Sequence, residues 1–256
     1  MIRLFVSDID GCLAEPYQPY SLAHFQILAG YARAAGGVHE DGRSPVLPSL
    51  TLCSGRPYPY VEAMTQVLGI RVPVLFESGG GLFDPVTAQV TWHPLVTAEL
   101  EERLEDVRRW MRTEAIRGTR MSYDIGKRTQ VGIIGPDPAE VAERVPLVEA
   151  YVAEHHPDMR VFHTPVSIDV LPPGIDKREG LRWLGEQLGI APADMAYMGD
   201  TNGDLEALAS VGYSFAPANA TPEVRARVDV VTRGAVIEGV LSAYRWCIAE
   251  NERKAA

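Results

Sequence analysis

Short apolar segments alternate with helical segments at both ends of the chain, and this alternation limits the possible fold more than any other feature of the sequence. Residues 2–7 are rich in strand-forming side chains, and residues 21–35, 49–53, 57–68 and 72–76 continue as helix, strand, helix and strand. Strands that alternate with helices predict a mainly parallel sheet covered by helices. We therefore predict an α/β fold built on a doubly wound, Rossmann-like sheet.

The pattern changes in the middle of the chain. Residues 97–117 predict an amphipathic helix, and a second helix begins near Asp137, where we expect Pro146 to interrupt or kink it. Four runs in which polar and apolar residues alternate are typical of half-buried antiparallel strands, and they lie at residues 89–93, 129–134, 160–163 and 166–171. This region therefore predicts an α+β arrangement.

Alternation of helix and strand returns from Asp176 onward. We predict a core domain formed by residues 1–82 and residues 168–256. Residues 83–167 are predicted to form an α+β domain inserted between these two parts. Residues 36–48 are rich in glycine and proline and predict a loop without an assigned function.

Charge and composition exclude several classes of partner. The chain of 256 residues has a net charge of −10, whereas nucleic-acid binders use clustered Lys and Arg. No apolar run approaches the roughly 20 residues of a membrane span, and acidic residues follow the first apolar run too soon for a signal peptide. The three cysteines, Cys12, Cys53 and Cys247, lack the spacing of a metal site. We expect a cytoplasmic protein that contacts neither nucleic acid nor a membrane; the oligomeric state is not indicated.

Polar residues follow several of the predicted core strands or begin the helices after them. In a doubly wound sheet such positions converge on one crevice. They are Asp8 and Asp10, Ser54 and Gly55, Lys177, and Asp200 and Asp204. Each alone fits an ordinary turn, helix cap or solvated charge, but their order and placement together favour a functional site.

The four acidic residues suit phosphoryl transfer, which needs a nucleophile and a proton donor for the leaving oxygen. Asp8 can attack phosphorus while Asp10 donates a proton and later recovers it. Asp8 and Asp200, with support from Asp204, provide the oxygen ligands that Mg²⁺ prefers. The predicted cofactor is therefore Mg²⁺.

Phosphate binding is the other requirement. Gly11 permits a sharp turn that exposes backbone N–H groups to phosphate. Ser54, followed by Gly55, supplies a hydroxyl donor, and Lys177 supplies a positive charge. Arg56 either contacts substrate or pairs with a carboxylate at the surface, and the sequence leaves both interpretations open.

These motifs resemble, in order, those of the haloacid dehalogenase superfamily. The matching segments are Asp8-Ile9-Asp10-Gly11-Cys12-Leu13, Thr51-Leu52-Cys53-Ser54-Gly55-Arg56, Gly174-Ile175-Asp176-Lys177, and Gly199-Asp200 with Asp204. The insertion is similar to the type IIB cap of sugar-phosphate phosphatases, Cof-like phosphatases and phosphomannomutases. The resemblance implies that Asp8 is the nucleophile and a metal ligand, that Asp10 is the acid/base and a ligand through its carbonyl, and that Asp200 ligates Mg²⁺.

The resemblance also implies that Asp204 supports the metal and that Ser54 and Lys177 hold phosphate. Two positions depart from the family pattern. Many relatives have Thr in place of Cys12, and many have Asn in place of Gly203. Asn202 lies one position earlier and is a candidate substrate contact.

We expect a magnesium-dependent phosphatase that acts on a small phosphomonoester, either a sugar phosphate or a related phosphorylated acid, through an aspartyl-phosphate. A phosphohexomutase or phosphotransferase would use the same carboxylates, and a catalytically silent binding module would retain the same scaffold. The retained Asp8 and Asp10 favour an enzyme. Candidate specificity contacts in the insertion are Arg120, Tyr123, Lys127, Arg128 and His163.

Overall fold

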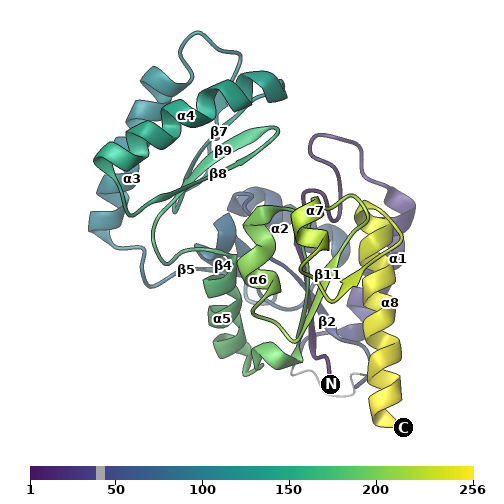
Figure 1. Cartoon of the computed structure of the whole chain (residues 1–256). Helices are drawn as coiled ribbons and strands as arrows, with labels where there is room; N and C mark the ends of the chain where they lie inside the picture. The colour runs from purple at the N-terminus through teal and green to yellow at the C-terminus, as the bar shows by residue number, and fades with distance from the viewer. Residues whose placement is uncertain (39–43) are drawn as a thin grey trace.

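The structure of the protein is a computed structural model, and it describes residues 1–38 and 44–256. Residues 39–43 of the predicted loop at residues 36–48 lie outside the described residues. The chain forms a core that contains both termini and a smaller unit that lies over one end of it (Figure 1).

The centre of the core is a five-stranded sheet in the order β12-β11-β10-β1-β2, in which every pair of neighbouring strands is parallel. Its strands are β1 (Leu4–Ser7), β2 (Ser49–Leu52), β10 (Met195–Met198), β11 (Tyr213–Ala216) and β12 (Val230–Val231). All four residues of each of β1, β2 and β10 are buried. This burial explains the continuous apolar runs in the sequence, because helices cover both faces of a parallel sheet. The predicted α/β fold is confirmed.

Strand register brings three chain segments to one edge of the sheet. Ser7 at the end of β1 is aligned with Leu52 of β2 and with Met198 of β10. The segments that begin at Asp8, Cys53 and Gly199 therefore leave the sheet side by side. The polar residues of three predicted motifs lie at this edge.

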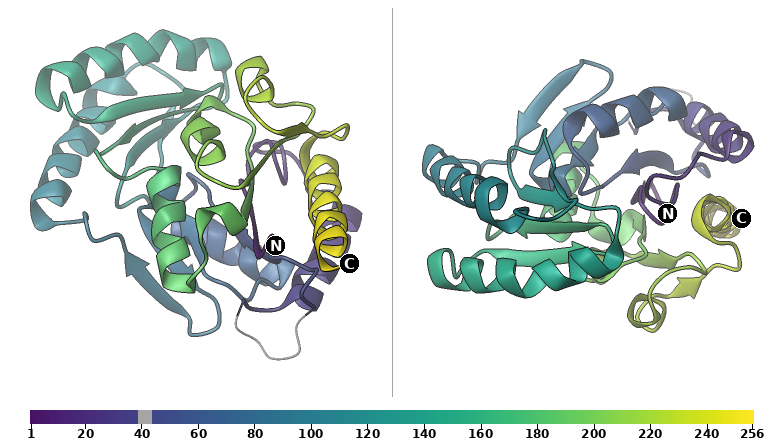
Figure 2. Two further views of the ribbon diagram at one scale, coloured as in Figure 1. Left: turned by 60° about the horizontal axis from the view of Figure 1, so that its bottom comes forward. Right: turned by 90° about the horizontal axis from the view of Figure 1, so that it is seen from above.

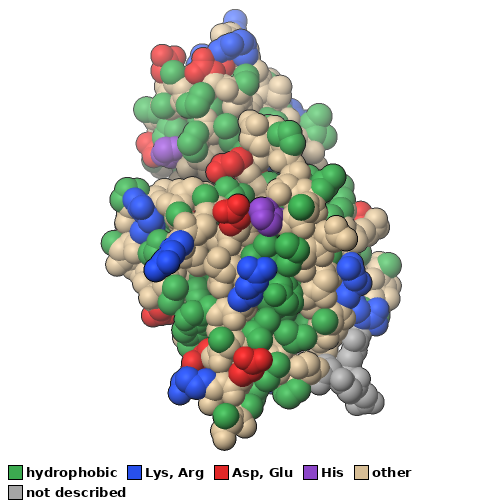
Figure 3. Space-filling model, turned by 90° about the vertical axis from the view of Figure 1, so that its right-hand side faces the viewer, with side chains coloured by type: hydrophobic (Ala, Val, Ile, Leu, Met, Phe, Trp, Pro, Cys, Tyr) green, Lys and Arg blue, Asp and Glu red, His purple; other side chains and the backbone are tan. Residues whose placement is uncertain are grey.

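Helices pack on both faces of the central sheet (Figure 2). They are α1 (Leu22–Ala35), α2 (Tyr58–Leu68), α5 (Lys177–Leu188), α6 (Leu205–Leu208), α7 (Pro222–Arg225) and α8 (Val236–Ala255). Helices α1 and α8 lie side by side, and on the face that they form acidic and basic side chains are interspersed (Figure 3). Among the described residues, no helix combines the length and the apolar character needed to cross a membrane.

A second, antiparallel sheet continues from the core. It consists of β3 (Val74–Phe76), β4 (Gly81–Asp84) and β5 (Gln89–Trp92), and a parallel bridge between Cys53 and Leu75 links it to the end of β2. The strand expected at residues 89–93 is thus present as β5, and its partner is β4. Leu82 and Phe83 of β4 belong to the core's hydrophobic cluster.

The smaller unit is an antiparallel sheet with two helices on one face. The strand order is β6-β7-β9-β8, and the other face of the sheet is turned toward the core (Figure 1). Its elements are α3 (Ala98–Trp110), which continues as a π-helical turn at Met111–Ala115, β6 (Ser122–Tyr123), β7 (Val131–Ile134), α4 (Pro138–His155), β8 (Arg160–Thr164) and β9 (Ser167–Leu171). A separate hydrophobic cluster, with members from Leu100 to Ile175, fills the space between these helices and the sheet.

Helix α4 runs through Pro146 without a break, so of the two expectations at this residue the interruption is wrong, and the kink stays a prediction. Proline removes the hydrogen bond to the carbonyl four residues earlier, which is that of Ala142. Both Pro146 and Ala142 lie on the exposed face of the helix, where water can hydrate this carbonyl. The buried residues Val145 and Val148 hold the opposite face against the sheet.

Candidate active site

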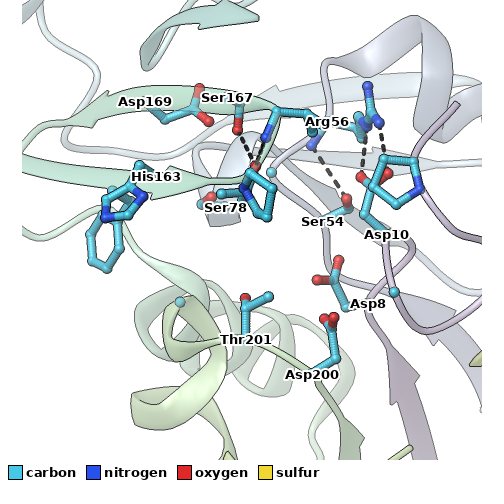
Figure 4. A pocket seen from close by; sticks show the side chains of 18 of the residues that line it. Asp8, Asp10, Ser54, Arg56, Ser78, His163, Ser167, Asp169, Asp200 and Thr201 are labelled. Atoms are coloured by element: carbon cyan, nitrogen blue, oxygen red, sulfur yellow. Dashed lines mark hydrogen bonds and ion pairs between the residues drawn. The ribbon is translucent and has the colours of Figure 1, made fainter. Parts of the chain in front are cut away.

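A cavity of about 660 Å³ lies between the carboxyl ends of the central strands and the sheet of the smaller unit (Figure 4). The core lines it with Asp8, Asp10, Gly11, Ser54, Gly55, Arg56, Lys177 and Asp200. The smaller unit lines it with Asp124, Lys127, Gln130, His163, Ser167 and Asp169. Asp8 and Asp200, which are 192 positions apart in the sequence, therefore line one space.

The Asp8 carboxylate is held in a fixed orientation. Its Oδ1 atom accepts a hydrogen bond from the backbone N–H of Ile9 at 2.7 Å, and its Oδ2 atom lies 2.7 Å from the Nζ atom of Lys177. Asp8 is only 6% exposed, and it follows directly after the buried strand β1. The strand and the two contacts fix the position from which this carboxylate meets the cavity.

Asp204 lies behind the cavity. Its Oδ1 atom accepts hydrogen bonds from Lys177 at 2.6 Å and from the Tyr197 hydroxyl at 2.7 Å, and its Oδ2 atom accepts from the backbone N–H groups of Asp200 and Thr201. The residue is fully buried. With both oxygens engaged in this way, Asp204 orients Lys177 and the Asp200 loop.

Asp200 and Gly11 approach each other closely. A Cβ atom on Gly11 would lie 1.9 Å from Asp200 Oδ2, and the φ angle of Gly11 is +71°. Both facts require glycine here, because an L side chain would clash and would strain the backbone. The Gly11 carbonyl accepts a hydrogen bond from Asn219 Nδ2 at 2.9 Å, a contact across 208 residues that the sequence analysis missed.

The acidic cluster has the composition of a site for a divalent cation. One oxygen from each of Asp8, Asp200 and Asp204 lies within 4.8 Å of the others. Burial, and then the neighbouring carboxylates, raise the pKa of Asp200 to about 9; burial raises the pKa of Asp8 to about 7, although Lys177 opposes this shift. A bound cation would stabilise the ionised carboxylates. The residues present therefore fit a metal ion bound through Asp8 and Asp200.

Asp10 forms an ion pair with Arg56. The Nε and Nη2 atoms of Arg56 each donate to one oxygen of Asp10 at 2.6 Å (Figure 4). The guanidinium group also lies over the rings of Tyr17 and Tyr60. Of the two interpretations left open for Arg56, the structure shows a carboxylate partner, and this partner is the candidate acid/base. The pairing was not visible in the sequence because 46 residues separate the two side chains.

Ser54 and Asn202 lie differently with respect to the cavity. Ser54 is 1% exposed, lines the cavity, and accepts a hydrogen bond at Oγ from the backbone N–H of Arg56 at 3.3 Å. Asn202 is not among the lining residues, and its amide contacts Glu223 at 2.9 Å and Thr221 at 3.2 Å. Its neighbour Thr201 lines the cavity instead.

Two of the five candidate contacts of the insertion, Lys127 and His163, line the cavity, whereas Arg120, Tyr123 and Arg128 do not. Lys127 is 8% exposed, and its Nζ atom lies 3.0 Å from Asp124 and 2.5 Å from Asp169. These two carboxylates lie outside the motifs recognised in the sequence. Strand alternation could have indicated Asp169, because it lies between the buried residues Ile168 and Val170 on the opposite face of β9.

Comparisons with known proteins, by sequence and by structure, all point to hydrolases. A sequence profile described as haloacid dehalogenase-like hydrolase matches residues 140–243. The phosphoglycolate phosphatase of Methanopyrus kandleri is 29% identical over 252 residues, covering 98% of this chain and 99% of the relative. That of Natronomonas pharaonis is 25% identical over 255 residues, covering 95% and 96%. The crystal structure of a haloacid dehalogenase-like hydrolase from Bacteroides thetaiotaomicron superposes with a TM-score of 0.70 at 19% identity, covering 96% of this chain and 99% of that chain.

Proposed function

This chain belongs to the haloacid dehalogenase-like hydrolases and is a phosphatase, and we propose that it cleaves a small phosphomonoester through an aspartyl-phosphate formed on Asp8, with Mg²⁺ as cofactor. One observation carries the proposal. Asp8 lies at the cavity in contact with Lys177, next to Asp200 and two residues from Asp10. A nucleophile, a positive charge, a metal site and a proton donor are thus available in one place.

In this proposal Asp8, Asp200 and the backbone carbonyl of Asp10 hold the magnesium ion, and Asp204 supports them. When bound, the cation neutralises charge on the phosphate oxygens and so allows an anionic carboxylate to approach. Lys177 and Ser54 bind phosphate oxygens from the protein side. The turn at Gly11 adds backbone N–H groups.

The first chemical step forms a bond between an Asp8 carboxylate oxygen and phosphorus. The bond between phosphorus and the ester oxygen breaks, and Asp10 donates a proton to the leaving oxygen, so that an alcohol departs. Asp10 must first turn away from Arg56 far enough to reach this oxygen. Arg56 would then contact the substrate or return to Asp10 after the step.

The second step releases phosphate. A water molecule attacks phosphorus, Asp10 accepts its proton, and the bond between phosphorus and the Asp8 oxygen breaks. The products are inorganic phosphate and the original Asp8 carboxylate. Access of water at this step is what separates a phosphatase from a mutase.

The substrate proposed here is a sugar phosphate or a related phosphorylated acid. Both relatives described above are named phosphoglycolate phosphatase, which supports a small phosphorylated acid. The cavity of about 660 Å³ also has room for a larger leaving group. The smaller unit, from α3 to β9, would act as the cap that selects among these groups. The free, buried cysteines support a cytoplasmic location.

The experiment that tests this function measures phosphate release with and without Mg²⁺, from para-nitrophenyl phosphate, phosphoglycolate and a set of sugar phosphates. We expect release that depends on Mg²⁺ and stops when a chelator is added. Transfer of phosphate within a sugar, dependent on a bisphosphate activator, would indicate a mutase. Release that persists unchanged in the chelator would contradict the proposed metal site.

A further inference from the structure

Glu77 is a buried carboxylate that the proposed reaction does not use, and it joins the core to the smaller unit. It lies directly after β3 and is 0% exposed. Its Oε2 atom accepts hydrogen bonds from the backbone N–H of Arg128 at 2.9 Å, and from the backbone N–H and the hydroxyl of Thr129 at 2.6 and 2.7 Å. Hydrogen bonds to a buried carboxylate are among the stronger ones in proteins.

The backbone next to Glu77 is attached to the loop that carries Ser54. The Glu77 N–H donates to the Arg56 carbonyl at 3.0 Å, and the Ser78 N–H donates to the Ser54 carbonyl at 2.9 Å. A further contact comes from the smaller unit, where Gln130 Nε2 donates to the Gly55 carbonyl at 2.6 Å. Residues 128–130 are therefore fastened to residues 54–56, both through Glu77 and directly.

The fastened segment also carries side chains that line the cavity. Lys127 directly precedes Arg128 and lies between Asp124 and Asp169, all three at the cavity wall. Movement of Arg128 and Thr129 away from Glu77 would move Lys127 with them. The contacts of Glu77 therefore connect this part of the cavity wall to the core.

The contact between Glu77 and residues 128–129 is maintained although the backbone conformation of Glu77 is unfavourable. Glu77 has a φ angle of +48°, in the region that disfavours residues other than glycine. Thr129 packs so closely on Gly80 that a Cβ atom there would lie 1.9 Å from its hydroxyl oxygen. Burial also raises the pKa of the Glu77 carboxyl. Strain that the surrounding structure maintains is frequently associated with a functional role.

We propose that Glu77 is a positioning residue: it holds residues 124–130 against residues 54–56, so that Asp124 and Lys127 face the leaving group of a substrate whose phosphate is bound in the core. The inference rests on the proposed function, because it assigns the phosphate to the core side of the cavity. Glu77 itself contacts neither the phosphate nor the leaving group.

Four variants separate this role from a general effect on stability. Thr129→Val removes the hydroxyl donor and keeps the size of the side chain, whereas Thr129→Ser keeps the donor. Glu77→Asn tolerates the positive φ angle but is too short to reach Thr129. Glu101→Gln is the matched control, because Glu101 pairs with the Arg128 side chain at the surface and, among the described residues, does not hydrogen-bond to Glu77.

The measurements are kcat and KM for para-nitrophenyl phosphate, inhibition by inorganic phosphate, and amide hydrogen exchange. For Thr129→Val and Glu77→Asn we expect exchange at Arg128 and Thr129 to rise about tenfold and kcat to fall about tenfold, while the inhibition constant for phosphate changes less than about twofold. Thr129→Ser and Glu101→Gln should match the wild type in all three measurements.

Two results would overturn the inference while leaving the proposed function in place. One is faster exchange at Arg128 and Thr129 with an unchanged kcat. The other is a loss of kcat accompanied by an equal weakening of phosphate inhibition and faster exchange in β1 and β10, which would make Glu77 a general determinant of stability. If the wild type releases no phosphate from any ester tested, the proposed function itself fails, and the inference fails with it.

Discussion

Asp8 combines burial with two fixed hydrogen-bond partners, so a substitution can remove its nucleophilic oxygen without changing the shape of the site. We expect Asp8→Asn to lower kcat by more than about a thousandfold, because the amide cannot form the acyl phosphate. Phosphate release from para-nitrophenyl phosphate is the measurement, and circular dichroism should show a retained fold. Asn202→Ala is the matched control, since this side chain does not line the cavity. Equal loss in both variants would contradict the assignment.

Gly11 provides a second test at a single residue. Gly11→Ala should destabilise the fold by about 1–3 kcal/mol through its left-handed backbone and the contact with Asp200, and it should abolish Mg²⁺-dependent activity. Gly189→Ala is the control, because Gly189 has a φ angle of +60° but no heavy atom within 4 Å of the added Cβ atom. It should lower the melting temperature and leave kcat unchanged. Full activity of Gly11→Ala would show that the Asp200 carboxylate can be displaced without an effect on Mg²⁺-dependent catalysis.

At the scale of single residues, the sequence allowed the placement of several polar residues at the core side of the cavity to be predicted, because polar residues at strand ends converge in a parallel sheet. Asp8, Ser54 and Asp200 followed from this rule. The pairing of Asp10 with Arg56 and the role of Glu77 could not be predicted. Each depends on loops that meet only after the strands have paired, and loop geometry has no periodic pattern in the sequence.

At the scale of elements, α4 contains a proline that a helix interior normally excludes. Pro146→Ala restores the missing N–H and should raise the free energy of unfolding of this region by about 1–3 kcal/mol. Thermal unfolding and amide exchange in α4 are the measurements. Pro138→Ala is the control, because Pro138 is the first helical residue, where no hydrogen bond is lost. Equal effects of the two substitutions would contradict this explanation.

Helix α4 also illustrates a limit of predicting structural elements from the sequence. The pattern of apolar residues indicated the type of most elements, but it did not indicate β4, β6 or α7. It also allowed an interruption at Pro146, in a helix whose exposed face tolerates the proline. The pattern also did not indicate which strands pair with each other. Alternation predicted β5, but its pairing with β4 beside the core depends on packing.

At the scale of the whole molecule, the acidic cluster links pH, metal binding and stability. The pKa of Asp8 is raised to about 7 and that of Asp200 to about 9, against about 3.9 for an aspartate in an unfolded chain. Between these values the folded, metal-free protein carries more protons on these two carboxyl groups than the unfolded chain does. Their contribution to the free energy of unfolding must therefore decrease as the pH rises from about 4 to about 9.

This relation predicts how the melting temperature depends on pH. In chelator, the melting temperature of the wild type should fall between pH 5 and pH 9 more steeply than that of Asp200→Asn, which lacks one of the two carboxylates. Mg²⁺ should raise the melting temperature of the wild type more at pH 8 than at pH 5, because it binds the ionised carboxylates. It should have a smaller effect on Asp200→Asn at both values. Parallel profiles of melting temperature against pH for the two proteins in chelator would show that ionisation of the Asp200 carboxyl does not lower the free energy of unfolding. The electrostatic reason to expect a cation at this site would then be absent.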